Sequence, residues 1–375
     1  MRALVLEAEL SAAVALSDAA RLPASTVWAN PALVEREVPE PRIAAPHDVI
    51  VSVACCGICG SDLHASQAGP DGHVLFGGSA RLPVVLGHEL AGTVLHAGSA
   101  VTHLAAGDVV TVESIWACWN CDECRGGYLN ECRDGNLLGL TTDGGLAPLV
   151  RVDSRHCYSI TSLVRRHGID RAFELGALLE PLGVAYRGLV RAHFRADDRV
   201  VVVGVGPIGL ATVMLARALG ATQIAAFDRN ASRVALAAAA GARAFVAEDG
   251  TLDHALSEAF DGERATLAVE AGGTPGAFDS AFASLGNRGR LLVLGRMPAN
   301  VALDTNTLLS KALSVIGSRG HAGAGIFRTL IDRLADGSFD PSTIITGRFG
   351  FSQVQEAFAY ARLGDGGKTL IRVAE

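Results

Sequence analysis

Hydrophobic and polar positions follow two different periods along this chain. In the first third, short β-branched runs alternate with Gly, Pro and Asp signals, which predicts an antiparallel sheet or a small barrel. The clearest of these runs lie at 49–53, 90–95 and 108–112. The pattern becomes helical around residues 161–195. From Arg199 onward, strand-like runs alternate with apolar helical stretches, so a doubly wound parallel sheet is predicted for this part.

Three segments depart from these two patterns. Residues 8–34 are rich in alanine and weakly patterned, and we expect a surface excursion or an extra hairpin there. Residues 65–83 are rich in glycine and predict a loop that borders a binding pocket. Residues 324–375 contain a predicted helix at 326–336, followed by β-like pieces. We therefore predict a β-rich domain at 1–183, a parallel-sheet domain at 184–321, and a return to the first domain at 322–375.

Composition narrows the class of protein. The 375 residues are 49% hydrophobic and 19% charged, as in globular proteins rather than disordered ones. A net charge of -7 argues against a general binder of nucleic acids or anionic membranes. The chain has no apolar run long enough to span a bilayer and no basic start followed by an apolar core and a cleavage site. We therefore expect a soluble, cytoplasmic protein.

Half of the eight cysteines lie close together in the sequence. Their spacing is Cys118-x2-Cys121-x2-Cys124-x7-Cys132, which suits a closed tetrahedral zinc site without a free position for chemistry. The alternative is four unrelated thiols in a hydrophilic loop, and we favour the metal. The prediction is a structural zinc lobe at about 116–134. Ordinary packing is the better interpretation for Cys55, Cys56 and Cys157.

A second group of metal-ligand residues precedes this lobe. Residues 59–64 and 87–89 supply a thiol, a hydroxyl, imidazoles and carboxylates, namely Cys59, Ser61, Asp62, His64, His88 and Glu89. A catalytic zinc keeps three protein ligands and one open position, so we expect Cys59, His88 and a carboxylate to hold one. The alternative is that Cys59 is not a ligand and packs as a small buried hydrophobic residue. Glu180, set among leucines and followed by proline, is either an exposed carboxylate at a helix start or a further ligand.

A nucleotide-binding signature follows the helical region. The run at 199–203 predicts a buried strand, the run at 210–219 predicts a helix, and an acid, Asp228, ends the next strand. The turn between the first strand and its helix carries Gly204, Gly206, Pro207, Ile208 and Gly209. In this context Gly-x-Gly-x-x-Gly predicts a dinucleotide site whose pyrophosphate faces the helix N-terminus. Asp228 favours NAD over NADP. However, Arg229 and Arg233 lie in the region where an arginine can accept the 2′-phosphate of NADP, so NADP stays an alternative.

Together these motifs resemble the zinc-dependent medium-chain dehydrogenase/reductase family, which joins a chaperonin-10-like (GroES-like) catalytic domain to a Rossmann domain. The resemblance covers nearly the whole chain and rests on the stretches 59–64 and 87–89, the cysteine lobe and the glycine turn. Alcohol dehydrogenases have cysteine as the third catalytic ligand. Here that position holds Glu180, as in the branch of polyol and threonine dehydrogenases. Glu89 competes with Glu180 for the metal. Further likeness, at 74–89, Trp116 and 316–321, points to cyclitol dehydrogenases of the scyllo-inosose type.

The resemblance implies a catalytic zinc, a structural zinc and NAD as cofactors. It implies hydride transfer between a secondary alcohol and NAD, with Ser61 and His64 relaying the hydroxyl proton. Asp62 would orient His88; simple loop capping is the alternative for Ser61 and Asp62. Lys368 would reach the cofactor phosphates or lie solvated at the surface.

Rival functions stay open at this point. The expected substrate is a small polyol or cyclitol; a threonine, sorbitol or simple alcohol dehydrogenase is the competitor. Outside this class stand a non-catalytic NAD-binding subunit and a zinc-independent reductase of activated double bonds, both of which would lack the zinc motifs. The resemblance also implies a homodimer or homotetramer, with no nucleic acid or membrane as partner.

Overall fold

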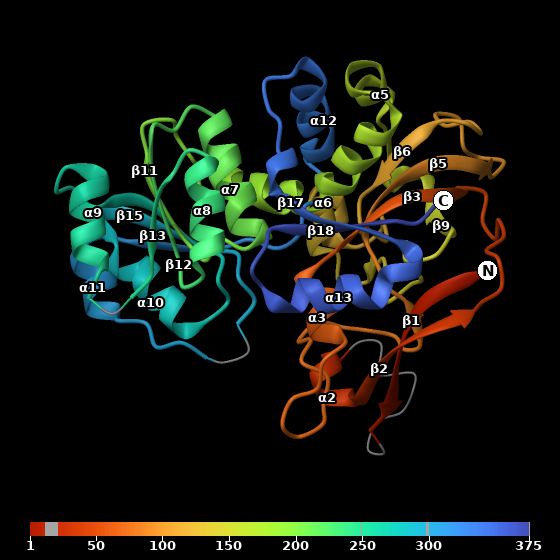
Figure 1. The fold of residues 1–375 in the computed structure, drawn as a ribbon, viewed down its shortest axis with the longest axis horizontal. Coiled ribbons are helices and arrows are strands. Elements are labelled where there is room, and N and C mark those ends of the chain that lie inside the picture. Colours follow the sequence, from red (N-terminus) through yellow and green to blue (C-terminus); the bar gives the residue numbers. More distant parts are fainter. Residues whose placement is uncertain (12–21, 249, 298–299, 375) are drawn as a thin grey trace.

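Two sheets of opposite character organise the computed structural model, which describes residues 1–11, 22–248, 250–297 and 300–374. An all-parallel sheet with its helices forms one lobe, on the left in Figure 1, and a mostly antiparallel sheet forms the other. The long helix α6 (Ile169–Arg191) lies where the two lobes meet. Within the described ranges, no helix is both long and apolar enough to cross a membrane.

The antiparallel sheet confirms the β-rich first domain. Its strand order is β10-β6-β5-β3-β18-β17, with β9 also paired to β3. The strands are β3 (Asp48–Ile58), β5 (Glu89–Ala97), β6 (Val109–Val112), β9 (Leu149–Asp153), β10 (Cys157–Ser159), β17 (Ile345–Gly350) and β18 (Lys368–Arg372). The last two come from the C-terminal segment, where β17 pairs with β18 and β18 pairs with β3.

A smaller sheet lies beside this domain. β1 (Arg2–Leu10) pairs antiparallel with β2 (Trp28–Glu37) and with β4 (Val84–Val85), and α2 (Ala24–Val27) precedes β2. The two strands pair at the ends of the weakly patterned stretch 8–34, whose residues 12–21 lie outside the described ranges. The register sets Leu4 and Leu6 into the core, because alternate strand residues face the same side.

The parallel sheet confirms the doubly wound domain. Its strand order is β13-β12-β11-β14-β15-β16, and every neighbouring pair is parallel. The strands are β11 (Arg199–Val203), β12 (Gln223–Asp228), β13 (Arg243–Val246), β14 (Ala265–Glu270), β15 (Leu285–Val293) and β16 (Ser314–Gly317). The helices that cover it are α7 (Pro207–Ala218), α8 (Ala231–Ala239), α9 (Leu252–Phe260), α10 (Pro275–Ala283) and α11 (Thr305–Ser310). Strands buried on both faces explain the continuous apolar runs in the sequence.

Short elements complete the first domain. They are α3 (Gly60–Ala65), β7 (Ile115–Trp116), α4 (Asp122–Arg125), η1 (Leu129–Glu131), β8 (Asn136–Leu137), η2 (Ser154–His156), α5 (Thr161–His167), α12 (Ile326–Asp336), η3 (Ser342–Ile344), η4 (Phe351–Gln353) and α13 (Val354–Leu363). The predicted boundary between residues 183 and 184 falls inside α6, which contacts β5 of one domain and α7 of the other. A single rigid helix therefore joins the two sheets.

The glycine turn after β11 gives the first test. A Cβ atom on Gly209 would lie 1.9 Å from the carbonyl oxygen of Gly204, a backbone atom that cannot move aside. We expect Gly209→Ala to lower the thermal midpoint by roughly 5–10 °C, since the α7–β11 contact must open. Calorimetry checks this. Gly276 lies in α10 with open space around its Cβ position, so Gly276→Ala should instead be neutral or stabilise by about 0.5–1 kcal/mol. Equal midpoints for the two variants would contradict the packing argument.

Candidate active site

The two stretches expected to bind metal are brought together by strand pairing. β3 and β5 pair antiparallel with Gly57 opposite Glu89, so Cys59, just beyond the end of β3, lies beside His88. A Cβ atom on Gly57 would come within 2.2 Å of the Glu89 carboxylate oxygen Oε2. Only glycine leaves room there for the acid to lie across the strand.

Helix α3 orients the first of these side chains. Cys59 is its N-cap, and the Asp62 carboxylate accepts a hydrogen bond from the Cys59 amide at 2.9 Å. The other oxygen of Asp62 lies 3.4 Å from Nδ1 of His88. Nε2 of His88 therefore points away from Asp62, and it lies 3.3 Å from the Ser61 hydroxyl. Burial alone disfavours the imidazolium, yet the charges of Asp62 and Cys59 raise the pKa of His88 well above its ordinary value.

Cys59, His88 and Glu89 form a compact donor set. One ligand atom from each of them lies within 4.8 Å of the others. Glu89 is fully buried, and its Oε2 has no hydrogen-bond partner among the described residues. A buried carboxylate oxygen without a partner, next to a thiol and an imidazole, is what a zinc ion would satisfy. The residues therefore fit the catalytic zinc that the sequence predicts.

The second oxygen of Glu89 meets Lys368. The ammonium lies 2.6 Å from Oε1 of Glu89 and also donates to the carbonyl of Ile58 at 3.1 Å. Lys368 is 1% exposed, so the expectation of a solvated surface lysine is wrong. Its placement follows from β18, which pairs with β3 and carries Lys368 at its start, where the side chain points inward. Although burial by itself opposes the charged form, Glu89 raises the pKa of Lys368.

Glu180 occupies a separate buried network. From the middle of α6, its Oε1 lies 3.1 Å from Nε2 of His321 and accepts a hydrogen bond from the Ser114 hydroxyl at 3.1 Å. Ser114 and Nε2 of His321 are 2.9 Å apart. Burial would raise the pKa of Glu180, but His321 and then His88 act more strongly and lower it to about 2. Glu180 is thus ionised and near His88, yet it lies outside the 4.8 Å donor set. Glu89 and Glu180 are both candidates for the third zinc ligand.

The four-cysteine lobe has the geometry of a tetrahedral site. All four sulfur atoms lie within 4.8 Å of one another, and three of the separations are 3.4, 3.7 and 4.0 Å. Four thiolates at the usual zinc–sulfur distance stand about 3.8 Å apart, so the sulfurs need almost no adjustment. The amides of Asn120 and Cys121 donate to Cys118 and lower the pKa of its thiol to about 7.

The remaining cysteines pack in the core, in agreement with their interpretation as hydrophobes. Cys55 and Cys56 point to opposite faces of β3 and join two different apolar clusters. Burial raises the pKa of Cys55 to about 12 and that of Cys157 further. These thiols are therefore protonated at neutral pH.

The dinucleotide signature adopts the predicted strand–turn–helix. Gly204 has φ +85°, and a Cβ atom on Gly204 would clash with the backbone of Gly272 at 2.4 Å. Asp228 ends β12, and its carboxylate accepts hydrogen bonds from the amides of Val205 and Asn230 at 2.8 and 2.9 Å. Each carboxylate oxygen keeps a lone pair for a ribose hydroxyl. The residues fit a dinucleotide.

Arginine side chains border this turn. The guanidinium of Arg233 lies about 3.6 Å from the Cβ position of Gly206 and 4.0 Å from Asp228, so it lies where the signature predicts phosphates. Arg229 is exposed. Arg233 also donates to the carbonyl of Gly366 at 3.3 Å, which links the parallel-sheet domain to the C-terminal segment.

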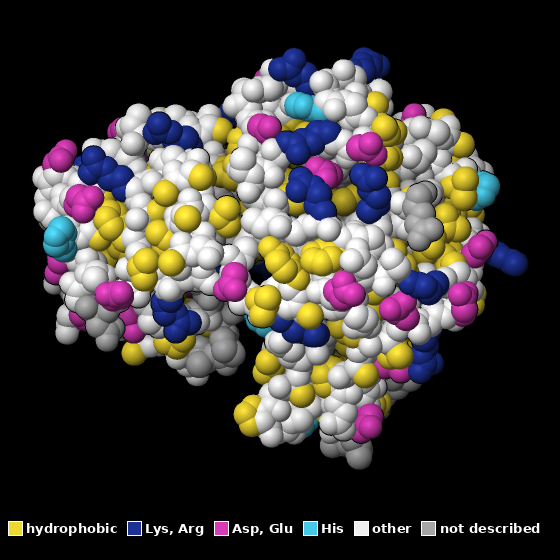
Figure 2. All heavy atoms as spheres, viewed as in Figure 1, with side chains coloured by type: hydrophobic (Ala, Val, Ile, Leu, Met, Phe, Trp, Pro, Cys, Tyr) yellow, Lys and Arg dark blue, Asp and Glu magenta, His cyan; other side chains and the backbone are white. Residues whose placement is uncertain are grey.

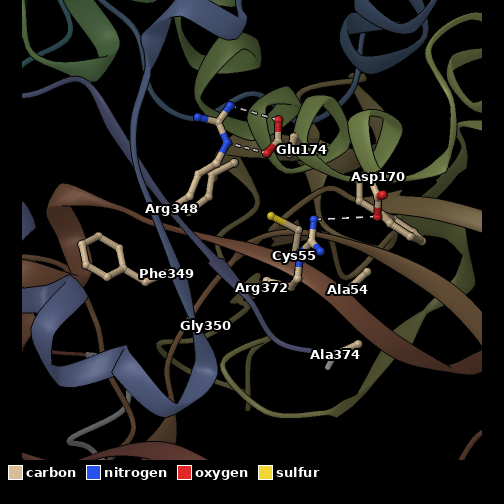
Figure 3. Close-up of a pocket in the computed structure, with 11 residues that line it drawn as sticks. Ala54, Cys55, Asp170, Glu174, Arg348, Phe349, Gly350, Arg372 and Ala374 are labelled. Carbon is tan, nitrogen blue, oxygen red and sulfur yellow. Dashed lines mark hydrogen bonds and ion pairs between the residues drawn. The ribbon is translucent and has the colours of Figure 1, made fainter.

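Two cavities adjoin the first domain. One, of about 310 Å³, lies between the domains, with Gly60 and His64 of α3 on one wall and Pro207 and Arg233 on the other. Figure 2 shows the surface notched between the lobe that carries α10 and the part that carries α2. The other cavity, of about 440 Å³, lies away from the metal-binding residues. In Figure 3 its polar side chains are already paired, Arg348 with Glu174 and Arg372 with Asp170.

Known proteins resemble this chain over most of its length. Residues 45–162 match the alcohol dehydrogenase GroES-like domain, and residues 207–336 match the zinc-binding dehydrogenase model. A scyllo-inosose 3-dehydrogenase from Thermotoga maritima is 32% identical over 365 residues, or 93% of this chain and 91% of that protein. D-xylulose reductase A from Aspergillus niger is 32% identical over 339 residues, or 89% and 91%. The solved structure of a Thermotoga maritima protein assigned as an alcohol dehydrogenase has a TM-score of 0.91 at 30% identity, covering 99% of this chain and 100% of that one.

Sequence reasoning missed the partners of the two acids, Ser114, His321 and Lys368. His321 falls in a stretch that the resemblance had marked, but nothing in its spacing assigns it to Glu180. Lys368 precedes the apolar run of β18, and that run is the only local signal that its side chain is enclosed.

The ion pair between Lys368 and Glu89 generates a prediction about stability. Lys368→Met leaves a buried carboxylate without its counter-charge, and we expect the free energy of unfolding of metal-free protein to fall by about 3–5 kcal/mol. Adding Glu89→Gln should recover most of the loss. Lys311→Met is the control, because that half-buried lysine donates only to a carbonyl. Denaturant unfolding measures all three variants. A loss no larger than that of the control would contradict the account.

The cysteine lobe generates a prediction about metal content. Cys124→Ser should reduce the bound zinc from two ions per chain to one, because the described residues form two donor clusters. The thermal midpoint should fall as well, since the lobe has almost no apolar core of its own. Elemental analysis and calorimetry give the two readouts. Cys157→Ser should keep both ions, since Cys157 lies outside either cluster and packs in an apolar core. Retention of both ions by Cys124→Ser would contradict a zinc site there.

Proposed function

Because this chain belongs to the zinc-dependent alcohol dehydrogenase family, we propose that it oxidises a secondary alcohol of a polyol or cyclitol to the ketone with NAD, or reduces the ketone with NADH. One observation carries the proposal. The inter-domain cavity has α3, which begins beside Cys59, on one wall and the dinucleotide turn on the other. A substrate bound at the metal residues would thus lie next to the reactive end of the cofactor.

The chemistry divides between the cofactors and the chain. When bound, zinc supplies the Lewis acidity that lowers the pKa of the substrate hydroxyl, and NAD accepts the hydride. Cys59, His88 and one of the two acids, Glu89 or Glu180, would hold the metal. Asp62 fixes the ring of His88 so that Nε2 faces the site.

The hydroxyl proton needs a path to solvent. The Ser61 hydroxyl lies inside the site, and His64, one turn of α3 further along, is exposed at the cavity wall. Partial burial of the ring and then the charge of Arg296 lower the pKa of His64, which favours the neutral ring that can accept a proton. We assign the relay to these two residues.

The substrate class follows from the donor set and from the relatives. A carboxylate in place of a second thiolate makes the metal a harder Lewis acid, which favours vicinal diols that offer two oxygens. The relatives named above act, by their names, on an inosose and on xylulose. Asp228 at the end of β12 favours NAD, because a 2′-phosphate would meet its carboxylate.

A substrate panel tests the function. Zinc-loaded protein with NAD should form NADH faster from inositols and alditols than from threonine or short alcohols. Ser61→Ala should lower kcat by about 100-fold, because the proton loses its first acceptor. Ser66→Ala is the matched control, since Ser66 caps the other end of α3. A preference for threonine or simple alcohols would favour the competing assignments, and no turnover of any alcohol would refute the proposal.

A further inference from the structure

Two arginines follow neighbouring strands of the parallel sheet at its carboxyl edge. Arg296 comes shortly after β15, and Arg319 shortly after β16. The two strands pair in parallel with Val293 opposite Gly317, so both arginines leave the same edge of the sheet. Ligands of doubly wound sheets bind at this edge.

Contacts with the first domain set both arginines near the segments that carry the metal-binding residues. The guanidinium of Arg296 lies 5.5 Å from the ring centroid of Phe76, in the glycine-rich loop of the first domain, and its charge acts on His64. The carbonyl of Arg319 accepts a hydrogen bond from Asn130 at 2.6 Å. Two residues later, His321 contacts Glu180. The arginines therefore lie on the substrate side of the cleft.

The order of strands separates these arginines from the cofactor phosphates. Asp228 marks the ribose site at β12, and the glycine turn marks the pyrophosphate site at β11. β15 and β16 lie two and three strands from β11, on the side away from β12. At the usual strand spacing this is on the order of 10–14 Å. The pyrophosphate has its own candidate partner in Arg233, so the charge of Arg296 and Arg319 is left for another ligand.

No acid in the described part of the chain forms an ion pair with Arg296 or Arg319, and both side chains are exposed. Partial burial and then the like charge of Arg319 lower the pKa of Arg296, as expected for two cations that follow neighbouring strands at the same edge of the sheet. Like charges at one edge repel each other, and a bound anion would relieve that repulsion.

We propose that Arg296 and Arg319 form an anion subsite of the substrate pocket, and that the preferred substrate is a polyol or cyclitol bearing a phosphate or carboxylate group. The inference rests on the proposed function and narrows its substrate class. Guanidinium groups suit both anions, because their planar donors match pairs of oxygens.

Paired substrates test the subsite. Initial rates with NAD would be compared for sorbitol, its terminal phosphate ester and gluconate, and for myo-inositol, an inositol monophosphate and glucuronate. At least one anionic member should exceed its neutral counterpart by about 10-fold or more in kcat/KM. Comparison of the phosphate-bearing with the carboxylate-bearing substrates shows which of the two anionic groups the subsite prefers. Neutral members that are turned over as well as or better than every anion would overturn the subsite while leaving the dehydrogenase intact. No turnover of any member would refute the proposed function as well.

Substitutions of the two arginines distinguish the loss of an anion subsite from a general loss of activity. Arg296→Met and Arg319→Met should each lower the anionic-to-neutral ratio of kcat/KM by about 10-fold, mainly through KM, and Arg296→Lys should restore part of it. Arg195→Met is the control, because Arg195 precedes β11 at the opposite edge of the sheet; it should leave the ratio unchanged. NADH affinity, measured by fluorescence titration, should stay within about 2-fold in all variants. An unchanged ratio in both methionine variants, or a matching loss of NADH affinity, would overturn the proposal.

Discussion

The antiparallel register of β3 against β5 and β18 is the constraint on which the rest of the site depends. It sets Gly57 opposite both Glu89 and Leu370, so the Cys59 end of β3, the His88–Glu89 pair and Lys368 converge on one side. The first two of these segments lie in the first quarter of the sequence, and Lys368 lies near its end. A slip of one residue would turn every side chain of the shifted strand to the other face of the sheet and disperse the donors.

The site keeps its buried charges by pairing each with an opposite one. Asp62 faces His88, Lys368 faces Glu89, and His321 faces Glu180. Leaving any of these groups unpaired in the interior would cost several kcal/mol. Oε2 of Glu89, beside the thiol of Cys59, is one of the buried side-chain atoms without a hydrogen-bond partner among the described residues. Lys368 restrains Oε1 of Glu89 and leaves Oε2 open to a metal, whereas Oε1 of Glu180 is restrained by His321 and Ser114. These partners lie far from both acids in the sequence, so spacing does not report them.

The sequence pattern predicted well those features whose geometry is set by residues close together in the sequence. The helix at 326–336 begins and ends at the residues expected, because its apolar face repeats with helical period and glycines flank it. The glycine turn and the cysteine lobe likewise carry their geometry within a few residues. Tertiary pairing decided the rest. Lys368 was misplaced because only its pairing with β3 encloses it, and Ser114 and His321 reach Glu180 from segments more than 60 residues away. No periodicity reports such contacts.

The central claim is that one metal ion, bound by Cys59, His88 and an acid, lies beside the reactive end of a dinucleotide. An anomalous-difference map from crystals grown with zinc and NADH measures this directly. The account predicts a zinc peak in contact with Cys59 Sγ and His88 Nε2, and a nicotinamide ring that faces it from the carboxyl edge of the parallel sheet. A zinc peak confined to the four-cysteine lobe, or a dinucleotide bound away from the turn at Gly204, would contradict it.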